Sequence, residues 1–353
     1  MMLGDIQIQD IMSLAKSKII PVSILIEVCY TCNERCNHCF LNSHKEKGLT
    51  LKQYKKLFAQ LVDAGTMFVI LTGGEPFTRP DFMDIVREAR RKRISVSIFT
   101  NGTLLTQEII TELKDLFVNE VHISLYGANA TTHDEVTRIR GSFSKSVQSI
   151  KWLVESGITT RIKSPLMSGT VSELDDIKKL SHTLGTEIQF TTVITAKDNG
   201  DKSTRQLQLS DEQLKLVLAD EEVSPISNES IRFGDYSRCI PCDTVLNGGA
   251  IDPYGNVYPC NQMRISGGNI LKIPFGDIWK DSLVFQDLRK IRLEDLHSCK
   301  RCEFFQFCTR CPGLASLEDG NLVGCSTSAK QLAKIRKELQ VFPTQRHIFS
   351  KPN

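Results

Sequence analysis

The chain has 353 residues, of which 41% are hydrophobic and 24% charged, and its formal net charge at pH 7 is +3. These values are typical of a globular protein with one large or two ordinary domains, and the charge argues neither for nor against a nucleic-acid partner. No stretch approaches the ~20 apolar residues of a membrane helix, and the first residues lack the pattern of a signal peptide. We therefore expect a cytoplasmic protein that binds neither membrane nor nucleic acid.

Short apolar runs alternate with amphipathic segments through the first half of the chain. Strands are predicted at residues 22–29, 68–71, 95–100, 120–125, 160–164 and 187–193. Helices are predicted between them at residues 51–64, 81–92, 107–116, 143–155 and 171–184. This alternation indicates repeated βα units and a parallel sheet. Six such units predict a partial α/β barrel rather than the closed barrel of about eight.

The second half of the chain is more polar, with further helices predicted at residues 210–219 and 326–340. Beyond residue 231, turn-forming residues are scattered among cysteines, and this region looks too irregular to form a core of its own. The predicted parts are an N-terminal extension (1–20), the partial barrel (21–205), a linker with a helix (206–238), a small cysteine-rich domain (239–328), and a C-terminal helix with a basic tail (329–353). We expect this tail to be a solvated helix end.

Twelve cysteines form two groups, at residues 29–39 and 239–325. A reducing compartment disfavours disulfides, so clustered cysteines there more often bind metal or take part in catalysis. In the first group, Cys32, Cys36 and Cys39 have the spacing CxxxCxxC. Three thiolates can hold three irons of a [4Fe–4S] cluster and leave the fourth iron open to an external molecule. A zinc site or a set of redox thiols is the alternative.

This motif directly follows the first predicted strand and precedes the aromatic Phe40, and it resembles the signature of the radical S-adenosylmethionine (SAM) superfamily. The resemblance implies that the three cysteines bind the cluster, that SAM chelates the open iron, and that Phe40 lies near the nucleoside. The product is then a 5′-deoxyadenosyl radical that abstracts hydrogen from a substrate. Cys29 lies outside the spacing and is expected to pack in the strand, whereas His38 is expected to be exposed.

Further motifs follow the predicted strands at their C-terminal ends, where parallel sheets carry their chemistry. Gly73, Gly74 and Glu75 resemble the GGEP element of the family, which implies that they bind SAM. Glycines allow close backbone approach, and a carboxylate can accept a hydrogen bond from the SAM ammonium group. Ser124 matches a position that contacts the ribose in relatives. Asn101 is either a turn residue or an amide that lines the site.

On the fifth predicted strand, Arg161 and Lys163 lie on one face by strand alternation. Lys163 is a candidate contact for the SAM carboxylate, as is Arg161, and either side chain could equally be solvated. Arg140 is expected to be a surface charge.

The second group contains eight cysteines, the number that fully ligates two [4Fe–4S] clusters. Its spacing resembles that of the SPASM domain, a twin-cluster extension of many radical SAM enzymes, except that two residues rather than three separate Cys308 from Cys311. The resemblance implies a nearer auxiliary cluster on Cys239, Cys242, Cys260 and Cys311. It implies a distal auxiliary cluster on Cys299, Cys302, Cys308 and Cys325. If Cys239 does not bind, the nearer cluster has an open iron; two zinc sites are the alternative to both clusters.

SPASM enzymes mostly modify peptides or protein side chains, and auxiliary clusters can take up the electron that such reactions release. We therefore expect SAM and three [4Fe–4S] clusters as cofactors, a ribosomally made precursor peptide as substrate, and a flavodoxin or ferredoxin as electron donor. Asn261 stands where sulfatase maturases carry an aspartate, which counts against formylglycine formation. Too few residues precede the first strand for a leader-binding domain, so a separate leader-binding protein or the region 231–275 is expected to recruit the peptide. A haem-synthesis enzyme and a non-catalytic electron carrier are the alternatives.

Overall fold

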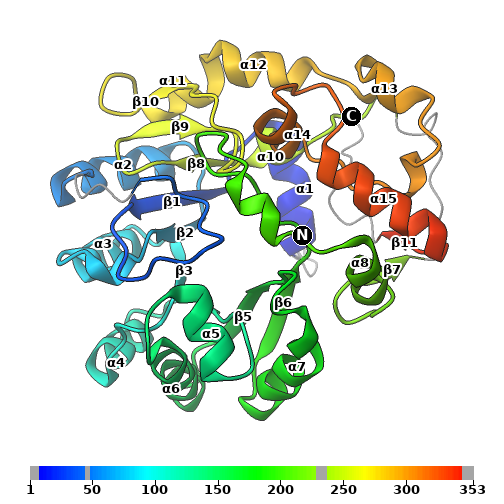
Figure 1. Ribbon diagram of the computed structural model, residues 1–353. Coiled ribbons are helices and arrows are strands. Elements are labelled where there is room, and N and C mark those ends of the chain that lie inside the picture. The colour runs from blue at the N-terminus through cyan, green and yellow to red at the C-terminus, as the bar shows by residue number, and fades with distance from the viewer. Residues whose placement is uncertain (1–7, 44–47, 228–236, 344–353) are drawn as a thin grey trace, which may run out of the picture.

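The computed structural model describes residues 8–43, 48–227 and 237–343 (Figure 1). Its main sheet has nine strands in the order β10-β9-β8-β1-β2-β3-β4-β5-β6. The six predicted strands are observed as β1 Ser23–Cys29, β2 Phe68–Gly73, β3 Ser95–Thr100, β4 Glu120–Ser124, β5 Thr160–Pro165 and β6 Glu187–Thr191. Successive strands from β1 to β6 pair in parallel. The predicted partial α/β barrel is therefore confirmed.

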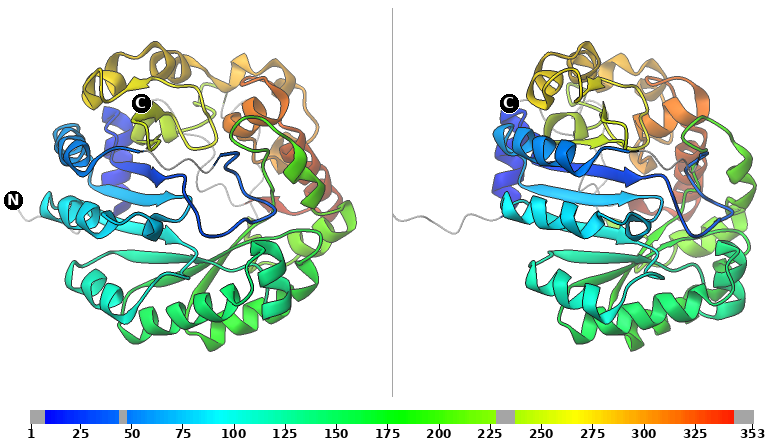
Figure 2. Two further views of the ribbon diagram at one scale, coloured as in Figure 1. Left: turned by 60° about the vertical axis from the view of Figure 1, so that its left-hand side comes forward. Right: turned by 90° about the vertical axis from the view of Figure 1, so that its left-hand side faces the viewer.

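Helices connect the strands and lie on the outer side of the curved sheet (Figure 2). The five predicted ones are observed as α2 Leu51–Asp63, α3 Phe82–Arg91, α4 Gln107–Asp115, α6 Ser142–Glu155 and α7 Leu174–Thr183. Helix α2 begins after Thr50, whose hydroxyl accepts from the backbone N–H of Gln53 while the Gln53 side chain accepts from the backbone N–H of Thr50. The first residues of the helix predicted at 171–184 form η2 Val171–Glu173, directly before α7. Unpredicted elements are α1 Ile8–Lys18, η1 Pro76–Thr78, α5 Ala130–Thr137 and η3 Ser203–Leu207.

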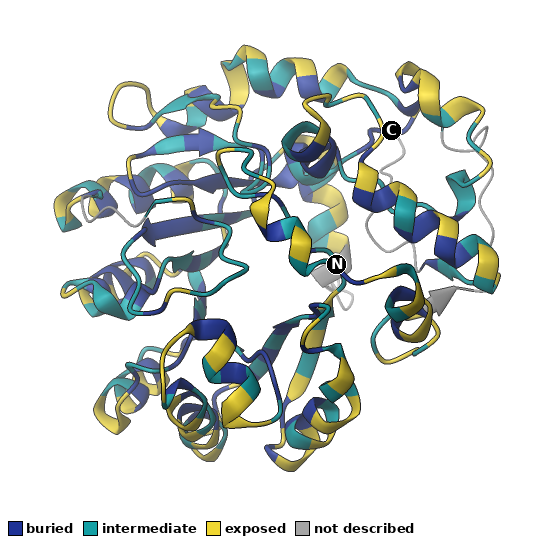
Figure 3. Ribbon diagram, in the orientation of Figure 1, coloured by how far each residue is buried: buried dark blue, intermediate teal, exposed yellow. Residues whose placement is uncertain are grey.

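The two faces of the sheet differ in polarity. Apolar side chains such as Ile26, Leu71 and Ile98 face the helices and form the core. Figure 3 shows buried strands at the centre of the sheet and exposed outer faces on the surrounding helices. The opposite face looks into the barrel and carries polar groups, among them His122 and Lys163. The barrel-facing side of β4 and β5 therefore carries ionisable groups.

The sheet continues beyond the predicted barrel. Strand β8 Gly248–Ile251 pairs in parallel with β1, and β9 Asn256–Tyr258 and β10 Gly268–Asn269 follow as antiparallel strands. Gly255, with φ of +86°, lies in the turn between β8 and β9. Side chains of α11 Phe275–Asp281 and α12 Leu283–Lys290 join the same core as the barrel strands. This region therefore extends the core of the barrel.

The rest of the cysteine-rich part consists of short helices joined by turns. They are α10 Thr244–Asn247, η4 Leu293–Asp295, α13 His297–Lys300, η5 Phe305–Phe307 and α14 Pro312–Asp319. The predicted helices α8 Asp211–Leu218 and α15 Thr327–Leu339 pack together through a small apolar cluster, and β7 Ile226–Ser227 pairs with β11 Phe342–Pro343. The end of the basic tail and part of the suggested leader-binding region 231–275 lie outside the described residues. Among the described helices, none has both the length and the apolar character of a membrane span.

Candidate active site and cluster-binding cysteines

Cys32, Cys36 and Cys39 lie in the loop that follows β1, at the C-terminal edge of the sheet. The thiols lie near one another. Burial raises the pKa of Cys32 to about 12, and the neighbouring Cys39 adds to this shift. Burial also raises the pKa of Cys36, again with contributions from the other two thiols. The backbone N–H groups of Arg35 and Asn37 donate to carbonyls at the end of α5, at 3.0 and 3.1 Å, and so hold the loop in place.

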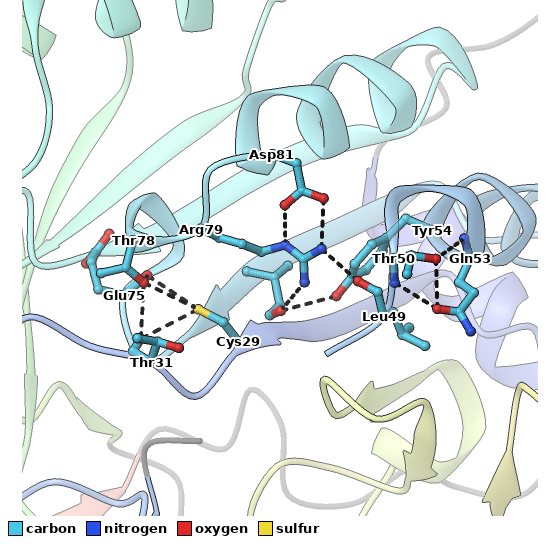
Figure 4. A network of polar contacts seen from close by, with 11 residues as sticks. Cys29, Thr31, Leu49, Thr50, Gln53, Tyr54, Glu75, Thr78, Arg79 and Asp81 are labelled. Carbon is cyan, nitrogen blue, oxygen red and sulfur yellow. Dashed lines mark hydrogen bonds and ion pairs between the residues drawn. The ribbon is translucent and has the colours of Figure 1, made fainter. Parts of the chain in front are cut away.

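Cys29 is buried at the end of β1, as predicted (Figure 4). Its Sγ donates to the carbonyl of Glu75 at 3.4 Å and to that of Thr31 at 3.6 Å, and lies 3.9 Å from the hydroxyl of Thr78. Cys29 therefore contacts the GGEP segment. The three other thiols, in the loop after β1, are the candidate metal ligands.

His38 is not exposed, so that expectation is wrong. Its ring packs edge-on against Tyr126, with the ring centroids 4.6 Å apart. Burial lowers the pKa of His38 to about 4. The loop folds back onto the end of β4, which the residue's place within the cysteine motif does not indicate.

The GGEP segment is fixed to the chain on both sides of the cysteine loop. Arg79 donates two hydrogen bonds to the carboxylate of Asp81, at 2.7 and 2.9 Å. The same guanidinium donates to the carbonyls of Val28 at 2.9 Å and Leu49 at 2.7 Å (Figure 4). It therefore ties β1 and the start of α2 to the end of β2.

Gly73 and Gly74 are required by the packing of this segment against the cysteine loop. A Cβ added at Gly73 would lie 2.2 Å from the carbonyl oxygen of Cys29, and one added at Gly74 would lie 2.2 Å from that of Thr31. Gly73 also has φ of +145°, which side chains disfavour. The predicted contact of these glycines with SAM remains a prediction. The structure gives a separate reason why both positions require glycine, since a side chain would clash with the backbone of the cysteine loop.

We expect Gly74→Ala to lower the free energy of unfolding by about 1–3 kcal/mol, because the obstructing atoms are backbone and cannot rotate away. The measurement is anaerobic denaturation, with bound iron measured in parallel. The matched control is Gly169→Ala, since a Cβ there meets open space and should change stability by less than about 0.5 kcal/mol. Equal stability of the two variants would contradict this account.

Glu75 is fully buried, and both its carboxylate oxygens accept hydrogen bonds from the protein. The donors are the hydroxyl of Thr100 at 2.7 Å and the backbone N–H groups of Asn101 at 2.7 Å and Phe77 at 3.1 Å. The side chain thus joins the ends of β2 and β3. Its predicted hydrogen bond with the SAM ammonium group remains a prediction, and the structure adds this bridging role.

Burial raises the pKa of Glu75 to about 7, against the opposing effect of its hydrogen-bond donors. An unfolded glutamate ionises near pH ~4.3, so the folded chain keeps the proton over a wider range. The raised pKa of Glu75 therefore adds to the free energy of unfolding. This contribution is fully present below the unfolded pKa and is lost as pH rises through about 7. We expect Glu75→Gln to flatten the pH dependence of stability between about pH 5.5 and 7. It should also cost about 1–3 kcal/mol, because a side-chain NH₂ then faces a backbone N–H.

The measurement is anaerobic urea denaturation of the loaded protein at several pH values. Glu155→Gln, an exposed change on α6, serves as the control and should keep the wild-type slope. If the free energy of unfolding of Glu75→Gln depends on pH as steeply as that of wild type, Glu75 is not the group that titrates in this range.

The other predicted SAM contacts lie along the same rim of the barrel. The side chain of Asn101 donates to that of Asn33 at 2.9 Å, which links the end of β3 to the cysteine loop. The Ser124 side chain lies near the buried phenol of Tyr126, against which Cys36 also packs. Lys163 is paired in register with Ser124.

Lys163 and Arg161 have different surroundings. The Lys163 Nζ lies 4.2 Å from the centre of the Phe99 ring, and burial lowers its pKa. Arg161 is paired with the carboxylates of Glu120 at 3.6 Å and Glu187 at 3.2 Å. Arg161 therefore has protein partners for its charge, whereas Lys163 retains an ammonium group that faces the barrel interior. Arg140 is exposed, as expected.

Several buried polar groups beside the thiols escaped the sequence analysis. Glu34 is 2% exposed, and one of its carboxylate oxygens lies 3.5 Å from the Cys36 Sγ. Its other oxygen is buried without a hydrogen-bond partner in the described structure. The imidazole of His133 stacks on the Tyr126 ring, 5.3 Å between centroids. From the sequence, a charged residue inside a cysteine loop is expected to be solvated. The burial of Glu34 therefore has no signal in the sequence.

A buried ion pair joins the C-terminal part to the barrel. Arg264 donates two hydrogen bonds to Glu27 on β1, at 2.6 and 2.8 Å, and the phenol of Tyr30 donates a third at 2.9 Å. The Arg264 guanidinium also lies over the rings of Phe40 and Tyr258, 5.3 Å from each centroid. Phe40 is therefore held between the cysteine loop and the residues after β9.

Four cysteines of the second group line one cavity, which we call the distal cavity. They are Cys299, Cys302, Cys308 and Cys325. Burial raises the pKa of Cys308 to about 12, and the other three thiols add to this shift. The structure thus brings together the four residues assigned to the distal cluster.

The nearer set is also gathered from distant parts of the chain. Burial raises the pKa of Cys260 to about 12, with contributions from Cys242 and Cys311. An adjoining apolar cavity, the proximal cavity, is lined in part by Cys242 and Arg310. Cys239 is buried nearby, 2% exposed, and its role as a ligand remains a prediction.

The spread of these thiols matters for the kind of metal group. Within the described ranges, no three His, Cys, Asp or Glu side chains converge as the ligands of a single ion do. Thiolates that each bind a different iron of a cluster stand farther apart than ligands of one ion. The donors that each set offers are thiols, and thiolates are the ligands of iron–sulfur clusters.

Comparisons with known proteins agree with this geometry. Residues 26–183 match the model of the radical SAM superfamily, and residues 226–303 match that of the SPASM iron-sulfur cluster-binding domain. The AdoMet-dependent heme synthase of Methanosarcina barkeri is 28% identical over 329 residues, which cover 85% of this chain and 94% of that protein. The mycofactocin maturase MftC of Mycobacterium tuberculosis is 27% identical over 304 residues, which cover 82% and 77%. The subtilosin biosynthesis protein AlbA of Bacillus subtilis is 26% identical over 300 residues, which cover 82% and 67%.

Solved structures share the fold at low sequence identity. Streptococcus suis SuiB bound to its precursor peptide SuiA has a TM-score of 0.66 at 16% identity, over 92% of this chain and 80% of that one. The protein anSMEcpe with bound AdoMet has a TM-score of 0.63 at 17% identity, over 90% and 92%.

A partial barrel with three thiols at its C-terminal edge, followed by a second set of cysteines, defines an enzyme of the SAM and iron–sulfur class. The chain carries a radical SAM domain at residues 26–183 and a SPASM iron-sulfur cluster-binding domain at residues 226–303. These two domains imply [4Fe–4S] clusters and SAM as its cofactors.

Proposed function

We propose that the protein uses a 5′-deoxyadenosyl radical to abstract hydrogen from a ribosomally made precursor peptide and so introduces a crosslink, thioether or similar modification. The observation that carries this proposal is the open edge of the sheet. Strand β6 pairs, among the described strands, with β5 alone. Its barrel-facing residues Glu187, Gln189 and Thr191 are exposed. An extended peptide can add to such an edge through main-chain hydrogen bonds.

We propose Cys32, Cys36 and Cys39 as the ligands of the cluster that cleaves SAM. Three thiols fit a [4Fe–4S] cluster with one iron left for SAM, and when bound this group supplies the electron for cleavage. The chain's own residues hold the loop: Asn101 through Asn33, and Arg79 through the carbonyl of Val28. Phe40, Ser124 and Lys163 remain the proposed SAM contacts on this rim, with Gly73, Gly74 and Glu75.

The proposal includes two auxiliary clusters, which gives three clusters in the chain. The distal one takes the four cysteines of the distal cavity, and the nearer one takes Cys239, Cys242, Cys260 and Cys311. Their task is to accept the electron that the substrate radical loses. A flavodoxin or ferredoxin is the proposed electron donor, and a separate protein that binds the leader peptide is a further proposed partner.

The test is an anaerobic reaction of the reconstituted protein with SAM, dithionite and a short peptide encoded beside its gene. We expect 5′-deoxyadenosine and a peptide of altered mass in matching amounts. A Gln189→Lys change should reduce peptide modification several-fold, because a charge on an edge strand disfavours strand addition. Gln107→Lys, on the exposed start of α4, is the matched control. Formation of 5′-deoxyadenosine with no change in peptide mass would overturn the peptide proposal.

A haem-precursor tetrapyrrole is the second candidate substrate. It is supported by the similarity to a heme synthase over 94% of that protein's length. The ammonium group of Lys163 lies over the Phe99 ring inside the barrel and forms no ion pair within the described residues, so it would suit an anionic substrate. Offering both substrates in one reaction separates the two candidates, since mass spectrometry shows which one is altered.

A further inference from the structure

Arg310 lies between the two sets of auxiliary cysteines. It stands between Cys308 and Cys311 in the sequence, and its side chain lines both the proximal cavity and the distal cavity. A guanidinium group therefore lies in the wall between the distal cavity and the proximal cavity, which Cys242 of the nearer set lines.

The position of this guanidinium is fixed by backbone carbonyls. Its Nε donates to the carbonyl of Gly324 at 2.8 Å, and its Nη2 donates to that of Leu322. Both carbonyls belong to the turn that leads into Cys325. The remaining nitrogen, Nη1, is buried and has no hydrogen-bond partner within the described part of the chain.

Thiols of both cysteine sets lie near Arg310. They belong to Cys299, Cys308 and Cys325 of the distal set and to Cys311 of the nearer set. In the described structure no carboxylate forms an ion pair with Arg310, so its charge is not neutralised within the wall.

We propose that Arg310 is a positioning residue for electron transfer that raises the reduction potential of both auxiliary clusters, and of the distal cluster most. A fixed positive charge in a site of low dielectric favours the more negative, reduced form of a nearby cluster. The substrate radical gives up one electron as it loses a proton to form the closed-shell product. This single electron reduces one auxiliary cluster at a time. The reduced cluster then passes this electron to a one-electron carrier of the flavodoxin or ferredoxin class. The inference rests on the proposed cluster ligands.

The test is a redox titration of the reconstituted protein with dithionite, followed by electron paramagnetic resonance, in wild type and Arg310→Gln. The equilibrium constant for reduction of the distal cluster should fall about tenfold, which is about 59 mV for a one-electron couple. Arg310→Lys keeps the charge and should retain most of the wild-type potential. Lys290→Gln removes an exposed charge that is paired with Asp287 and should leave all potentials unchanged.

Iron content separates the possible failures. Wild-type protein with fewer than three clusters would overturn the ligand proposal. Three clusters with unchanged potentials in Arg310→Gln would overturn the role of Arg310 alone. Loss of auxiliary clusters in both Arg310→Gln and Arg310→Lys would also overturn it, because the side chain would then serve only to fold the wall.

Discussion

Cys36→Ala is expected to reduce 5′-deoxyadenosine formation by at least about 1000-fold, which corresponds to about 4 kcal/mol in the activation barrier. The thiol lies beside those of Cys32 and Cys39, and its loss leaves two ligands for a cluster that needs three from the chain. The auxiliary cysteines are untouched, so about four of about twelve iron atoms should be lost. Chromatography with mass spectrometry measures the nucleoside, and iron analysis measures the clusters.

The control for Cys36→Ala is Cys29→Ser, which changes a buried cysteine only a few positions away. Because Cys29 contacts the carbonyls of Glu75 and Thr31, its hydroxyl analogue should keep iron content and SAM cleavage near wild type. Cleavage of SAM by Cys36→Ala at the wild-type rate would contradict the ligand assignment. Loss of the first cluster in Cys29→Ser would show that Cys29 is a cluster ligand and not a packing residue.

Arg264→Met is expected to lower the free energy of unfolding by about 3–5 kcal/mol, because it leaves the buried carboxylate of Glu27 without its cation. The side chains of Arg264 and Glu27 are only 14% and 6% exposed, so water can replace little of the lost interaction. Anaerobic urea denaturation of the loaded protein measures the change. The double variant Glu27→Gln/Arg264→Met should recover part of the loss, since no buried charge then remains.

An exposed ion pair supplies the control. Arg87 pairs with Asp84 and Glu112 on the surface, with its side chain 49% exposed, and Arg87→Met should cost less than about 1 kcal/mol. If Arg264→Met costs no more than Arg87→Met, the ion pair between the barrel and the C-terminal part is not stabilising.

The parallel strands and the cysteine loop are predictable because their information is local. Apolar runs such as Phe68–Gly73 have the length and composition of buried strands. The spacing of Cys32, Cys36 and Cys39 keeps all three in one loop. Parallel strands bring their C-terminal ends to one edge, so Asn101 and Ser124 reach the same rim.

Other features depend on contacts that the sequence does not signal. Glu27 and Arg264 are 237 positions apart, and neither lies in a recognisable motif. Strand β8 Gly248–Ile251 contains two glycines, which have weak strand propensity, and it forms because the edge of β1 is available for pairing. Helix α5 Ala130–Thr137 is rich in threonine, which also has low helix propensity.

The pairing of β8 with β1 also has a consequence for biosynthesis. Until residue 251 has left the ribosome, β1 lacks the neighbour on one of its sides. Its sequence, SILIEVC, is largely apolar, and such an edge is prone to intermolecular association. The nascent chain must therefore keep β1 from other chains while more than two hundred further residues are translated. For the same reason, a fragment that ends after β6 would be an incomplete sheet rather than an independent domain.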